Sequence, residues 1–381
     1  MRSATVIGAG IGGLAAAVGL HRTGWRVAVV EQAAEISAIG AGITLWPNAL
    51  RALEALGFGA RVRELGKPQE SAGVRTSSGR WLGRLDGALI ERKLGRPMLG
   101  VRRAQLHQLL LAALPADSLH TGVRVTAVGR DGSVPGLDLP PADLVIGADG
   151  INSQVRAQYW PGAPIPRYTG FAAWRGICER REHTDIAVSW GRGAEFGVVP
   201  LVDGQLYWYT AMSAPEDARN PDEHAFLQER LGSWHSPIPQ LIDATPPESL
   251  LRNDIRYLGG PLESYVDGNV ALLGDAAHAM TPHLGQGGCQ ALEDAVVLAA
   301  SCARYEDLTD ALAHYDAERR PRTQQIARAS YLAGRFGPFL ANPVAVALRD
   351  TAARLAPSGA AIKTFMWVSS WTPSLVEGLR A

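Results

Sequence analysis

A glycine-rich turn near the start of the chain constrains its fold more than any other feature. The apolar residues 4–7 run into Gly8, Gly10 and Gly13, and small and apolar residues then continue to Leu20. In a strand–turn–helix unit the first glycine permits a tight turn, the second lets a pyrophosphate approach the backbone, and the third lets helix and strand pack closely. We therefore expect a doubly wound α/β domain whose first helix directs free backbone amides at phosphate groups.

The residues after this turn support a dinucleotide site. We expect a helix over 12–22 that ends at Gly24, and then a strand over 25–30 that leads to Glu31. A carboxylate there can accept hydrogen bonds from an adenosine ribose and repels a 2′-phosphate, which favours FAD or NAD over NADP. The alternative, a secretory signal core, fits less well because glycines at dinucleotide spacing interrupt the apolar run.

Composition excludes several classes of function. The 381 residues include 37 basic and 37 acidic side chains, so charge does not indicate a nucleic acid or an anionic membrane surface as a partner. A hydrophobic fraction of 46% and a charged fraction of 19% are typical of a globular protein. The three cysteines, Cys178, Cys289 and Cys302, have no metal-site spacing and suggest a reducing cytosol. We expect a cytoplasmic monomer or homodimer without a metal.

Further glycine and acidic turns follow. The Gly40–Gly42 stretch precedes a helix expected over 48–56, and it is either a simple turn or a close approach to a flat ligand. Arg103 lies in the first turn of another expected helix, where a cation opposes the helix dipole and so hints at an anionic partner. Strands are expected near 123–125 and 142–148, and the second leads into the Asp149–Gly150 turn.

The pattern changes between residues 168 and 257, where short aromatic-rich strands predict an antiparallel sheet capped by helices. The chain then returns to the α/β pattern, with a strand over 269–273, the Gly274–Asp275 turn, a glycine-rich loop over 282–288 and a long helix. The tail over 343–371 predicts amphipathic helix.

These motifs occur in the order Gly8-x-Gly10-x-x-Gly13, Asp149-Gly150 and Gly274-Asp275-Ala276-Ala277-His278, the last followed by Pro282-x-x-Gly285-Gln286-Gly287. Together they resemble the FAD-dependent aromatic hydroxylases of the p-hydroxybenzoate and salicylate hydroxylase superfamily, the class A flavoprotein monooxygenases, over roughly residues 1–330. The resemblance implies a Rossmann-like FAD-binding domain formed by 1–66, 98–167 and 259–330. It also implies an inserted antiparallel substrate domain formed by 67–97 and 168–258, and a C-terminal helical segment over 331–381.

By this resemblance the protein hydroxylates an aromatic or heteroaromatic small molecule. FAD would be bound non-covalently, NADH or NADPH would reduce it transiently, and O2 would be the co-substrate that forms a flavin C4a-hydroperoxide. The chain has no second G-x-G-x-x-G motif for a separate pyridine-nucleotide domain. Two alternatives stay open: a flavin-dependent dehydrogenase or reductase of the same fold that does not use oxygen, and a non-catalytic flavin-binding redox protein.

The resemblance also implies cofactor contacts. The glycines of the first turn and Asp275 would hold the pyrophosphate, Arg103 the phosphate and ribityl region, and the amides of the 282–288 loop the pyrimidine edge of the flavin. Those amide dipoles would stabilise the negative charge of reduced flavin. His278 is expected to be structural. The matching positions are Gly8, Gly10, Ile11, Gly12, Gly13, Glu31, Gln32, Gly42, Asn48, Arg103, Asp149, Asp275, Pro282, Gly285, Gln286, Gly287 and Gly288.

In the family an antiparallel sheet forms a roof over the flavin. The corresponding pocket residues are Trp174, Trp190, Glu195, Gly197, Val199, Tyr207, Tyr209, Pro282 and His283. Relatives that act on anionic aromatics often present a cation on the roof, whereas this chain has Glu195 in the comparable place. We expect a neutral or weakly basic phenolic or heteroaromatic substrate, whose hydroxyl an ionised Glu195 or His283 helps to deprotonate. Alternatively, Glu195 is paired with Arg192 or Arg175. No catalytic residue is certain; the candidates are Glu195, His283, Arg175 and Tyr207.

Overall fold

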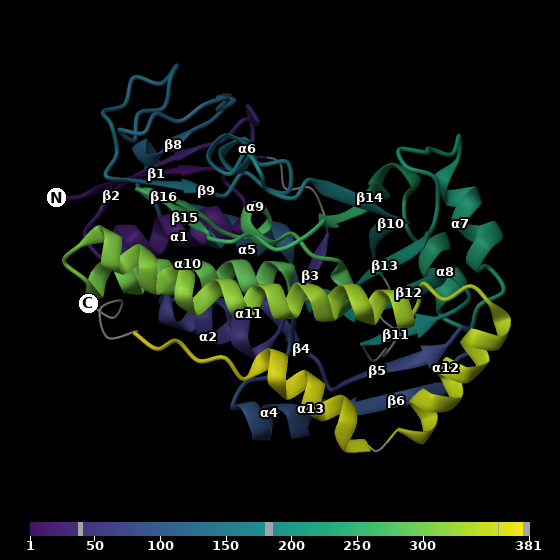
Figure 1. Ribbon diagram of the computed structural model, residues 1–381. Helices are drawn as coiled ribbons and strands as arrows, with labels where there is room; N and C mark the ends of the chain where they lie inside the picture. The colour runs from purple at the N-terminus through teal and green to yellow at the C-terminus, as the bar shows by residue number, and fades with distance from the viewer. Residues whose placement is uncertain (37–40, 180–185, 357, 376–381) are drawn as a thin grey trace.

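The computed structural model describes residues 1–36, 41–179, 186–356 and 358–375. Figure 1 shows two sheet-containing parts side by side, with long helices from the last third of the chain running across both. Gly40, which begins one of the predicted glycine loops, lies outside the described residues. In the part of the chain that is described, no helix combines the length and the apolar character needed to cross a membrane.

The first sheet contains the amino-terminal strand. Its strands are β1 (Ser3–Ile7), β2 (Arg26–Val30), β8 (Leu119–His120), β9 (Leu144–Gly147), β15 (Val266–Asp267) and β16 (Val270–Leu272). They lie in the order β15-β16-β9-β1-β2-β8, and all neighbours are parallel except β15 and β16. Helices α1 (Ile11–Arg22) and α10 (Gly287–Arg304) pack against each other. Their contact is so close that a Cβ on Gly19 would come within 2.7 Å of the Ala299 side chain. The predicted Rossmann-like sheet is confirmed.

The second sheet is mainly antiparallel. Its strands are β5 (Ser71–Thr76), β6 (Trp81–Asp86), β10 (Pro166–Glu179), β11 (Ala187–Trp190), β12 (Ala194–Pro200), β13 (Gln205–Ser213) and β14 (Leu251–Leu258). The order is β14-β10-β13-β12-β11-β5-β6, with one parallel pair, β11 and β5. Helices α7 (Glu223–Leu231) and α8 (Ile238–Asp243) cover one face through a cluster of buried apolar side chains. The other face of this sheet is directed toward the glycine-rich turn that begins β3.

A small third sheet joins these two parts. It contains β3 (Gly42–Leu45), β7 (Leu99–Arg102) and β4 (Gly66–Pro68), in the order β3-β7-β4. Around it lie α2 (Pro47–Ala55), α3 (Gly59–Leu65), α4 (Gly87–Leu94) and α5 (Arg103–Leu111). A Cβ on Gly42 would overlap the Tyr207 ring, so β3 approaches the second sheet directly.

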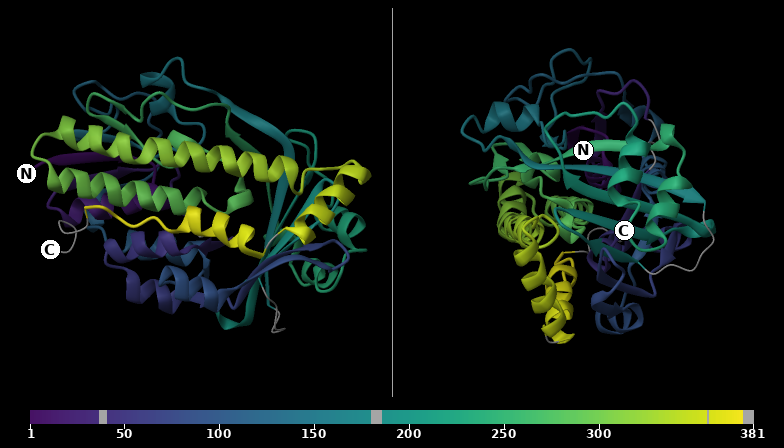
Figure 2. Two further views of the ribbon diagram at one scale, coloured as in Figure 1. Left: turned by 60° about the horizontal axis from the view of Figure 1, so that its bottom comes forward. Right: turned by 90° about the vertical axis from the view of Figure 1, so that its right-hand side faces the viewer.

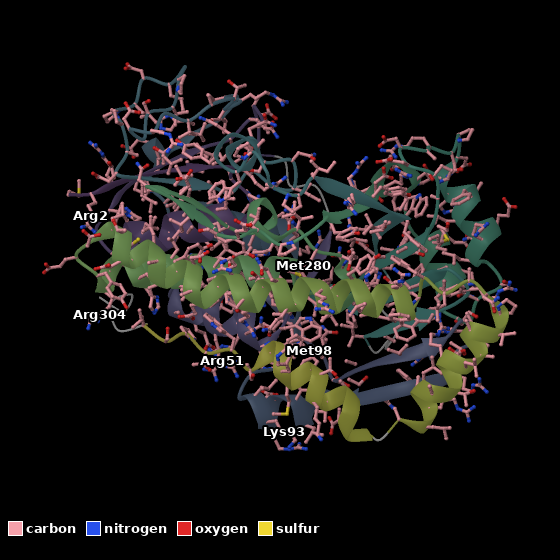
Figure 3. All side chains as sticks on the ribbon, in the orientation of Figure 1. Arg2, Arg51, Lys93, Met98, Met280 and Arg304 are labelled. Carbon is pink, nitrogen blue, oxygen red and sulfur yellow. The ribbon has the colours of Figure 1, made fainter. Side chains whose placement is uncertain are left out.

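The last third of the chain ties the two parts together. Helix α11 (Leu308–Phe336) has 29 residues and runs alongside α10, as Figure 2 shows. At a rise of about 1.5 Å per residue it extends about 44 Å. Helices α12 (Pro343–Leu355) and α13 (Ser358–Ser369) then turn back across β6. Arg51, labelled in Figure 3, fixes the end of this tail by donating hydrogen bonds to the carbonyls of Ser369 and Trp371 at 2.8 and 3.0 Å.

Two local predictions were wrong. The expected strand near 123–125 is irregular, and only β8, just before it, pairs with β2. The turn signals at Ser77–Gly79 and Asp86–Gly87 predict short strands and turns over 67–97. The segment also forms α4, because the Asp86 carboxylate accepts a hydrogen bond from Ala88 N and caps a helix that buries Ile90 and Leu94. A turn-forming Asp–Gly pair therefore begins a helix here.

Candidate functional site

The first glycine turn has the geometry that its sequence predicts. Gly8 has a φ of 107°, and a Cβ on Gly13 would overlap the carbonyl oxygen of Gly8. A Cβ on Gly10, by contrast, would meet nothing within 4 Å. Two of these glycines are thus required by the fold itself, whereas Gly10 borders open space at the amino terminus of α1, which has no side-chain cap. This open space suits the pyrophosphate of a dinucleotide.

Glu31 and Asp149 border the same end of the sheet. The Glu31 carboxylate accepts hydrogen bonds from the amides of Ala9 and Ala33, both at 2.9 Å, and so links β2 to the glycine turn. Asp149 Oδ2 accepts from Gln154 N at 2.7 Å, at the start of α6 (Gln154–Tyr159). The other oxygen of Asp149 is buried without a hydrogen-bond partner. Asp149 therefore has a structural contact and one acceptor left for a ligand.

Arg103 and Asp275 line a concave surface. Both residues have accessible surface, Arg103 in the first turn of α5 and Asp275 at the start of α9 (Asp275–His278). Protein atoms nevertheless surround them, so that desolvation raises the pKa of Asp275 and lowers the pKa of Arg103. A side chain that is both accessible and densely surrounded lies in the wall of a cleft. The two opposite charges lie near each other, because each acts electrostatically on the other.

The glycine-rich loop ends in the amino terminus of α10. A single 3₁₀ turn, Pro282–Leu284, is followed by Gly285 with a φ of 61° and by Gln286, which precedes the helix without capping it through its side chain. Gly285 lies against Trp46, since a Cβ there would be 3.1 Å from Trp46 Nε1. The uncapped first turn of α10 leaves amide donors for an anionic or carbonyl group.

His278 is structural, as expected, but its partner is a side chain rather than backbone. His278 Nε2 lies 2.6 Å from Asp294 Oδ2, which also accepts from Gly274 N at 3.0 Å. Arg319 Nε donates to the other Asp294 oxygen at 2.7 Å. Although burial raises the pKa of Asp294, His278 and Arg319 outweigh it and lower that pKa to about 2. Sequence reasoning missed Asp294 and Arg319; the signal was a pair of adjacent acids on an otherwise apolar helix.

The predicted pocket residues on β12 and β13 share one face of the second sheet. Glu195, Gly197 and Val199 alternate along β12, and Gly197 and Val199 are paired with Tyr209 and Tyr207 on β13. Gly197 has no space for a Cβ because the Tyr209 ring lies over it. This face is directed at β3 and the loop before α10.

Glu195 is neutral at neutral pH. Its side chain is 5% exposed, and burial raises its pKa to about 8 against the opposing effect of a hydrogen bond with Trp190. The alternative pairing with arginine is wrong, because Arg175 donates to Asn253 Oδ1 at 2.9 Å and Arg192 donates to the carbonyl of Ala341. Burial thus disfavours an ionised Glu195 near pH 7, and the carboxylic acid can donate a hydrogen bond instead.

His283 lies opposite Glu195. The distance from His283 Nε2 to Glu195 Oε1 is 4.0 Å, and the His283 side chain is 3% exposed. Burial lowers its pKa to about 4, which a weak contact with the backbone of Ser330 only partly opposes, and neither ring nitrogen makes a hydrogen bond of normal geometry. The ring meets Phe339 edge-on at 4.5 Å. A neutral imidazole with two unsatisfied nitrogens therefore faces a neutral carboxylic acid.

Of the two predicted pocket tryptophans, Trp190 lies beside Glu195, whereas Trp174 lies elsewhere. Trp190 is paired with Glu195 across β11 and β12 and bonds to it. Trp174 is 1% exposed, donates to Glu223 Oε2 at 2.8 Å and packs in the apolar cluster under α7. It cannot share a face with Arg175, because successive residues of a strand point to opposite sides.

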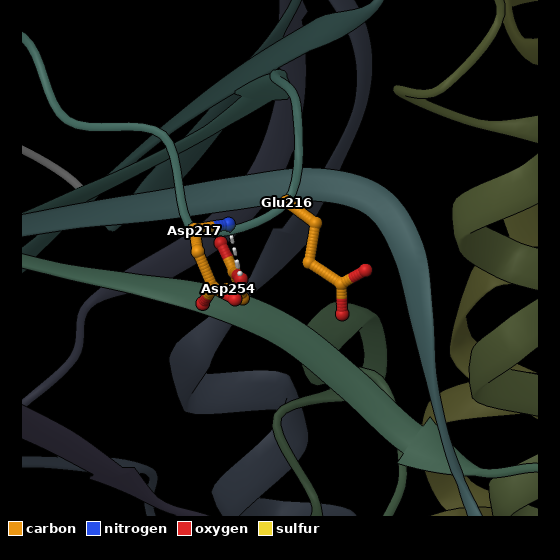
Figure 4. Close-up of side chains that lie close together, drawn as sticks. All are labelled: Glu216, Asp217 and Asp254. Carbon is orange, nitrogen blue, oxygen red and sulfur yellow. Dashed lines mark hydrogen bonds between the residues drawn. The ribbon is translucent and has the colours of Figure 1, made fainter.

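A cluster of three carboxylates lies away from these residues. Among the described residues, Glu216, Asp217 and Asp254 are the group whose spacing would suit a metal ion (Figure 4). Arg256 lies 2.7 Å from Glu216, and Arg252 lies 2.6 Å from Asp254. Asp217 N also donates to Asp254 Oδ2 at 3.0 Å. Two arginines thus pair with the three carboxylates, so the cluster is an ion-pair network that anchors a loop.

The residues around the glycine turns fit FAD. The open space at Gly10, the unpartnered oxygen of Asp149 and the charged pair Arg103 and Asp275 suit a diphosphate with its ribose and ribityl hydroxyls. At the other end, Asn48 Oδ1 and Gln286 Nε2 are buried without partners beside the uncapped start of α10. The open space at Gly10 and the accessible pair Arg103 and Asp275 are the features that best suit the cofactor.

Comparison with known proteins agrees with this geometry. Residues 2–330 match the family described as FAD binding domain. The chain is 38% identical over 366 residues to the aurachin C monooxygenase/isomerase of Stigmatella aurantiaca, covering 93% of this chain and 94% of that protein. It is 37% identical over 338 residues to the FAD-dependent urate hydroxylase of Klebsiella pneumoniae, covering 85% and 87%. It is 33% identical over 370 residues to the 2-heptyl-3-hydroxy-4(1H)-quinolone synthase of Pseudomonas aeruginosa, covering 92% and 93%.

Solved structures share the fold. Klebsiella pneumoniae HpxO complexed with FAD and uric acid superposes with a TM-score of 0.89 at 30% identity, covering 97% of this chain and 96% of that one. The 2-methyl-3-hydroxypyridine-5-carboxylic acid oxygenase has the same architecture, with a TM-score of 0.77 at 24% identity over 100% and 96% of the two chains.

Proposed function

This chain belongs to the FAD-dependent aromatic hydroxylases, and from that premise we propose that its substrate is a neutral heteroaromatic compound carrying a carbonyl or hydroxyl group. The protein is a flavoprotein monooxygenase that acts on an aromatic or heteroaromatic small molecule. Its family excludes the two alternatives of a dehydrogenase and a non-catalytic redox protein. The substrate class, by contrast, rests on residues of this chain.

The observation that carries the proposal is the uncharged pair on the pocket face. With a pKa of about 8, Glu195 is mostly protonated near pH 7, and with a pKa of about 4, His283 is neutral. Of the described pocket candidates, the cation is Arg175, and it is bound to Asn253 and to Tyr207. A buried anion would need a cation or several donors beside it, and no cation in the described part of the chain acts on Glu195 or His283. A neutral ligand that accepts one hydrogen bond and donates another would satisfy both side chains.

The names of two relatives are consistent with such a ligand. The quinolone synthase of Pseudomonas aeruginosa is named for a 4(1H)-quinolone, which carries a ring N–H and a ring carbonyl, and the protein of Stigmatella aurantiaca is named for aurachin C. The urate hydroxylase of Klebsiella pneumoniae is named for urate. The uncharged face of this chain favours the quinolone-like class over a urate-like anion.

The side chains would divide the work of binding and proton transfer. The protonated Glu195 would donate a hydrogen bond to the substrate carbonyl, and neutral His283 would accept a hydrogen bond from a ring hydroxyl or N–H, which makes the ring more electron-rich. Tyr207, Tyr209 and the edge of Phe339 would exclude water. FAD, when bound, supplies the redox chemistry that activates oxygen. For each ring hydroxylated, NAD(P)H and O2 would be consumed and one oxygen atom would leave as water.

The remaining assignments follow the family. The cofactor positions from Gly8 to Gly288 would hold FAD non-covalently, with NADH or NADPH as transient reductant. Arg103 and Asp275 would contact its central part because they line the cleft between the glycine turn and the roof. The enzyme would work in the cytoplasm as a monomer or homodimer.

The test is substrate-stimulated oxidation of NADH and NADPH in air by the FAD-loaded protein, with hydrogen peroxide measured alongside. The panel pairs each neutral 4-quinolone or hydroxypyridine with an anionic analogue, such as urate or a pyridine carboxylate. We expect a neutral member to accelerate oxidation, with little peroxide and an oxygenated product. If NAD(P)H oxidation were coupled tightly to product formation with the anionic members alone, the proposed substrate class would be refuted, while the monooxygenase assignment would stand.

A further inference from the structure

Helix α12 is amphipathic, but its apolar side faces the solvent. Val344, Leu348 and Leu355 are separated by four and by seven residues, so they form one stripe along the helix. Their exposed fractions are 67%, 66% and 78%. A surface helix of a globular protein ordinarily directs such a stripe at the core. The stripe of α12 is therefore free to contact something other than the protein's own core.

The side of α12 that faces the protein is charged. Arg349 and Asp350 are 6% and 16% exposed, and their side chains pair at 2.7 Å. Arg349 Nη1 also donates to the carbonyl of Gly337 at 2.9 Å, and its guanidinium lies 5.3 Å from the centre of the Trp190 ring. Rotating the helix to hide its stripe would break these contacts. They stabilise the orientation in which the apolar side points outward.

Exposed apolar side chains are concentrated in this part of the chain. Among the described residues, eight large apolar side chains are exposed, and six of them lie between residues 332 and 367. These six are the stripe of α12, Leu332 and Phe336 near the end of α11, and Trp367 on α13. In the right-hand view of Figure 2, the yellow helices lie below α11 on the same side of the molecule. Proteins rarely leave apolar side chains gathered at the surface unless they bind something there.

The charges that accompany this apolar surface are positive. Helices α11, α12 and α13 carry four exposed cations, Arg328, Arg335, Arg354 and Lys363. Between residues 328 and 375 the sequence has one acidic residue, Asp350, which is paired with Arg349. The zero net charge of the whole chain, which does not indicate an anionic membrane as a partner, averages over this asymmetry. Apolar side chains flanked by cations are typical of a helix that lies on an anionic lipid surface.

We propose that α12 docks the protein, through the stripe of Val344, Leu348 and Leu355, onto the surface of a bilayer that contains anionic phospholipids. The stripe enters the boundary between headgroups and acyl chains, and the exposed cations face the phosphate groups. With 13 residues, α12 lies in this surface and does not span it. A second copy of the chain suits the face less well, because a two-fold interface would bring its cations against each other. The inference is independent of the substrate.

The experiment measures binding of the full-length, FAD-loaded protein to vesicles by flotation. One set of vesicles contains phosphatidylcholine alone, and the other contains phosphatidylcholine mixed with phosphatidylglycerol. At low ionic strength we expect the affinity for the mixed vesicles to be at least about tenfold higher. This difference should shrink as salt is added, because salt screens exposed charges. Absence of binding to the mixed vesicles, or equal affinity for both sets, would overturn the proposal.

Two single substitutions of equally exposed side chains test the stripe itself. Leu348→Gln keeps a high helix propensity and removes apolar surface, so affinity for the mixed vesicles should fall about tenfold. Ile165→Gln is the matched control, because Ile165 is 73% exposed but lies outside the segment from 332 to 367. It should bind as the native protein does. Neither variant should change the melting temperature, since both side chains are exposed.

The contribution of charge is tested separately with Arg354→Gln. Its affinity for the mixed vesicles should fall about fivefold, while its affinity for phosphatidylcholine alone should stay the same. Equal losses of vesicle binding in Leu348→Gln and Ile165→Gln would overturn the proposal. A native dimer that Leu348→Gln dissociates, with vesicle binding unchanged, would also overturn it and would make the stripe an interface between two copies of the chain. Analytical ultracentrifugation detects this second case.

Discussion

Gly10 and Gly13 lie three residues apart in one turn, yet their missing side chains serve different purposes. At Gly13 a Cβ would overlap the Gly8 carbonyl, whereas at Gly10 it would project into open space. We expect Gly13→Ala to lower the melting temperature of the apoprotein. Gly10→Ala should leave it unchanged and weaken FAD binding by about tenfold, because the methyl group occupies cofactor space. Thermal melts of the apoprotein and FAD titrations check both; equal apoprotein destabilisation by both variants would contradict this division.

Glu195 should make stability depend on pH in a defined window. Its pKa is about 8 in the folded protein and near its ordinary value in the unfolded chain, so the folded state binds the extra proton between these values. The stability that this proton confers is complete below about pH 4.5 and is lost as pH rises through about 8. Glu195→Gln cannot ionise and should lack this loss. Relative to the native protein, the variant should gain a few kcal/mol in unfolding free energy from pH 5 to 8.

Urea unfolding across this pH range measures the effect, with the exposed Glu248→Gln as a control that should show none of it. The groups that face Glu195 are His283, Tyr209 and Trp190. His283, with a pKa of about 4, stays neutral throughout the window. Parallel stability curves for the native protein and E195Q would show that Glu195 is ionised in the folded state.

At the scale of single residues, the glycines that the fold requires could be predicted from the sequence, whereas the partners of the charged side chains could not. The Gly8 and Gly13 requirements follow from backbone geometry that is local in sequence. The partner of Glu195 could not be predicted, because Arg175 and Arg192 were both available within twenty residues and the choice depends on where β14 and the α11–α12 connection lie. Asp294 was missed because its partners, His278 and Arg319, come from separate elements.

Among the elements, α11 both packs along α10 and contacts the pocket residue His283. Gly334 lies inside this helix, where glycine is less favourable than alanine by about 1 kcal/mol. It is retained because a Cβ there would overlap the His283 ring. We expect Gly334→Ala to lower kcat/KM at least about tenfold by displacing His283, with FAD affinity unchanged. Ala333→Gly, one residue earlier, should do the opposite, lowering the melting temperature without affecting kcat/KM; steady-state kinetics and thermal melts separate the two.

Elements with strong local signals could be predicted, and those that depend on neighbours could not. The expected helix over 12–22 corresponds to α1, Ile11–Arg22, because its glycine turn and its small residues define both ends. The segment near 123–125 has a strand-like composition, but the sheet ends at the two-residue β8, so no further ladder forms there. The helix α4 was missed because its Asp–Gly start is also a turn signal.

On the scale of the whole molecule, the C-terminal tail covers a buried ion-pair cluster formed by Glu293, Arg319 and Arg322. Trp371 is 9% exposed, and its ring lies 5.8 Å from the Arg319 guanidinium, while Arg322 donates to the carbonyl of Val368 at 2.7 Å. We expect Trp371→Ala to destabilise the protein by about 3 kcal/mol. Trp367→Ala is the matched control, because Trp367 is 42% exposed. If both variants lost the same unfolding free energy in urea, the contact of Trp371 with the cluster would have no specific role in stability.

The strand order of the first sheet has a consequence for how the protein is made. β1 pairs with β9, and β9 with β16, so this side of the sheet is completed only after residues 144–147 and then 270–272 have been synthesised. At about 5 to 20 residues per second, a ribosome needs on the order of 10 to 60 s to reach β16. Until then the nascent chain carries an apolar α/β layer with an open edge. Protection of this edge by chaperones during translation should therefore raise the yield of folded enzyme in a cell.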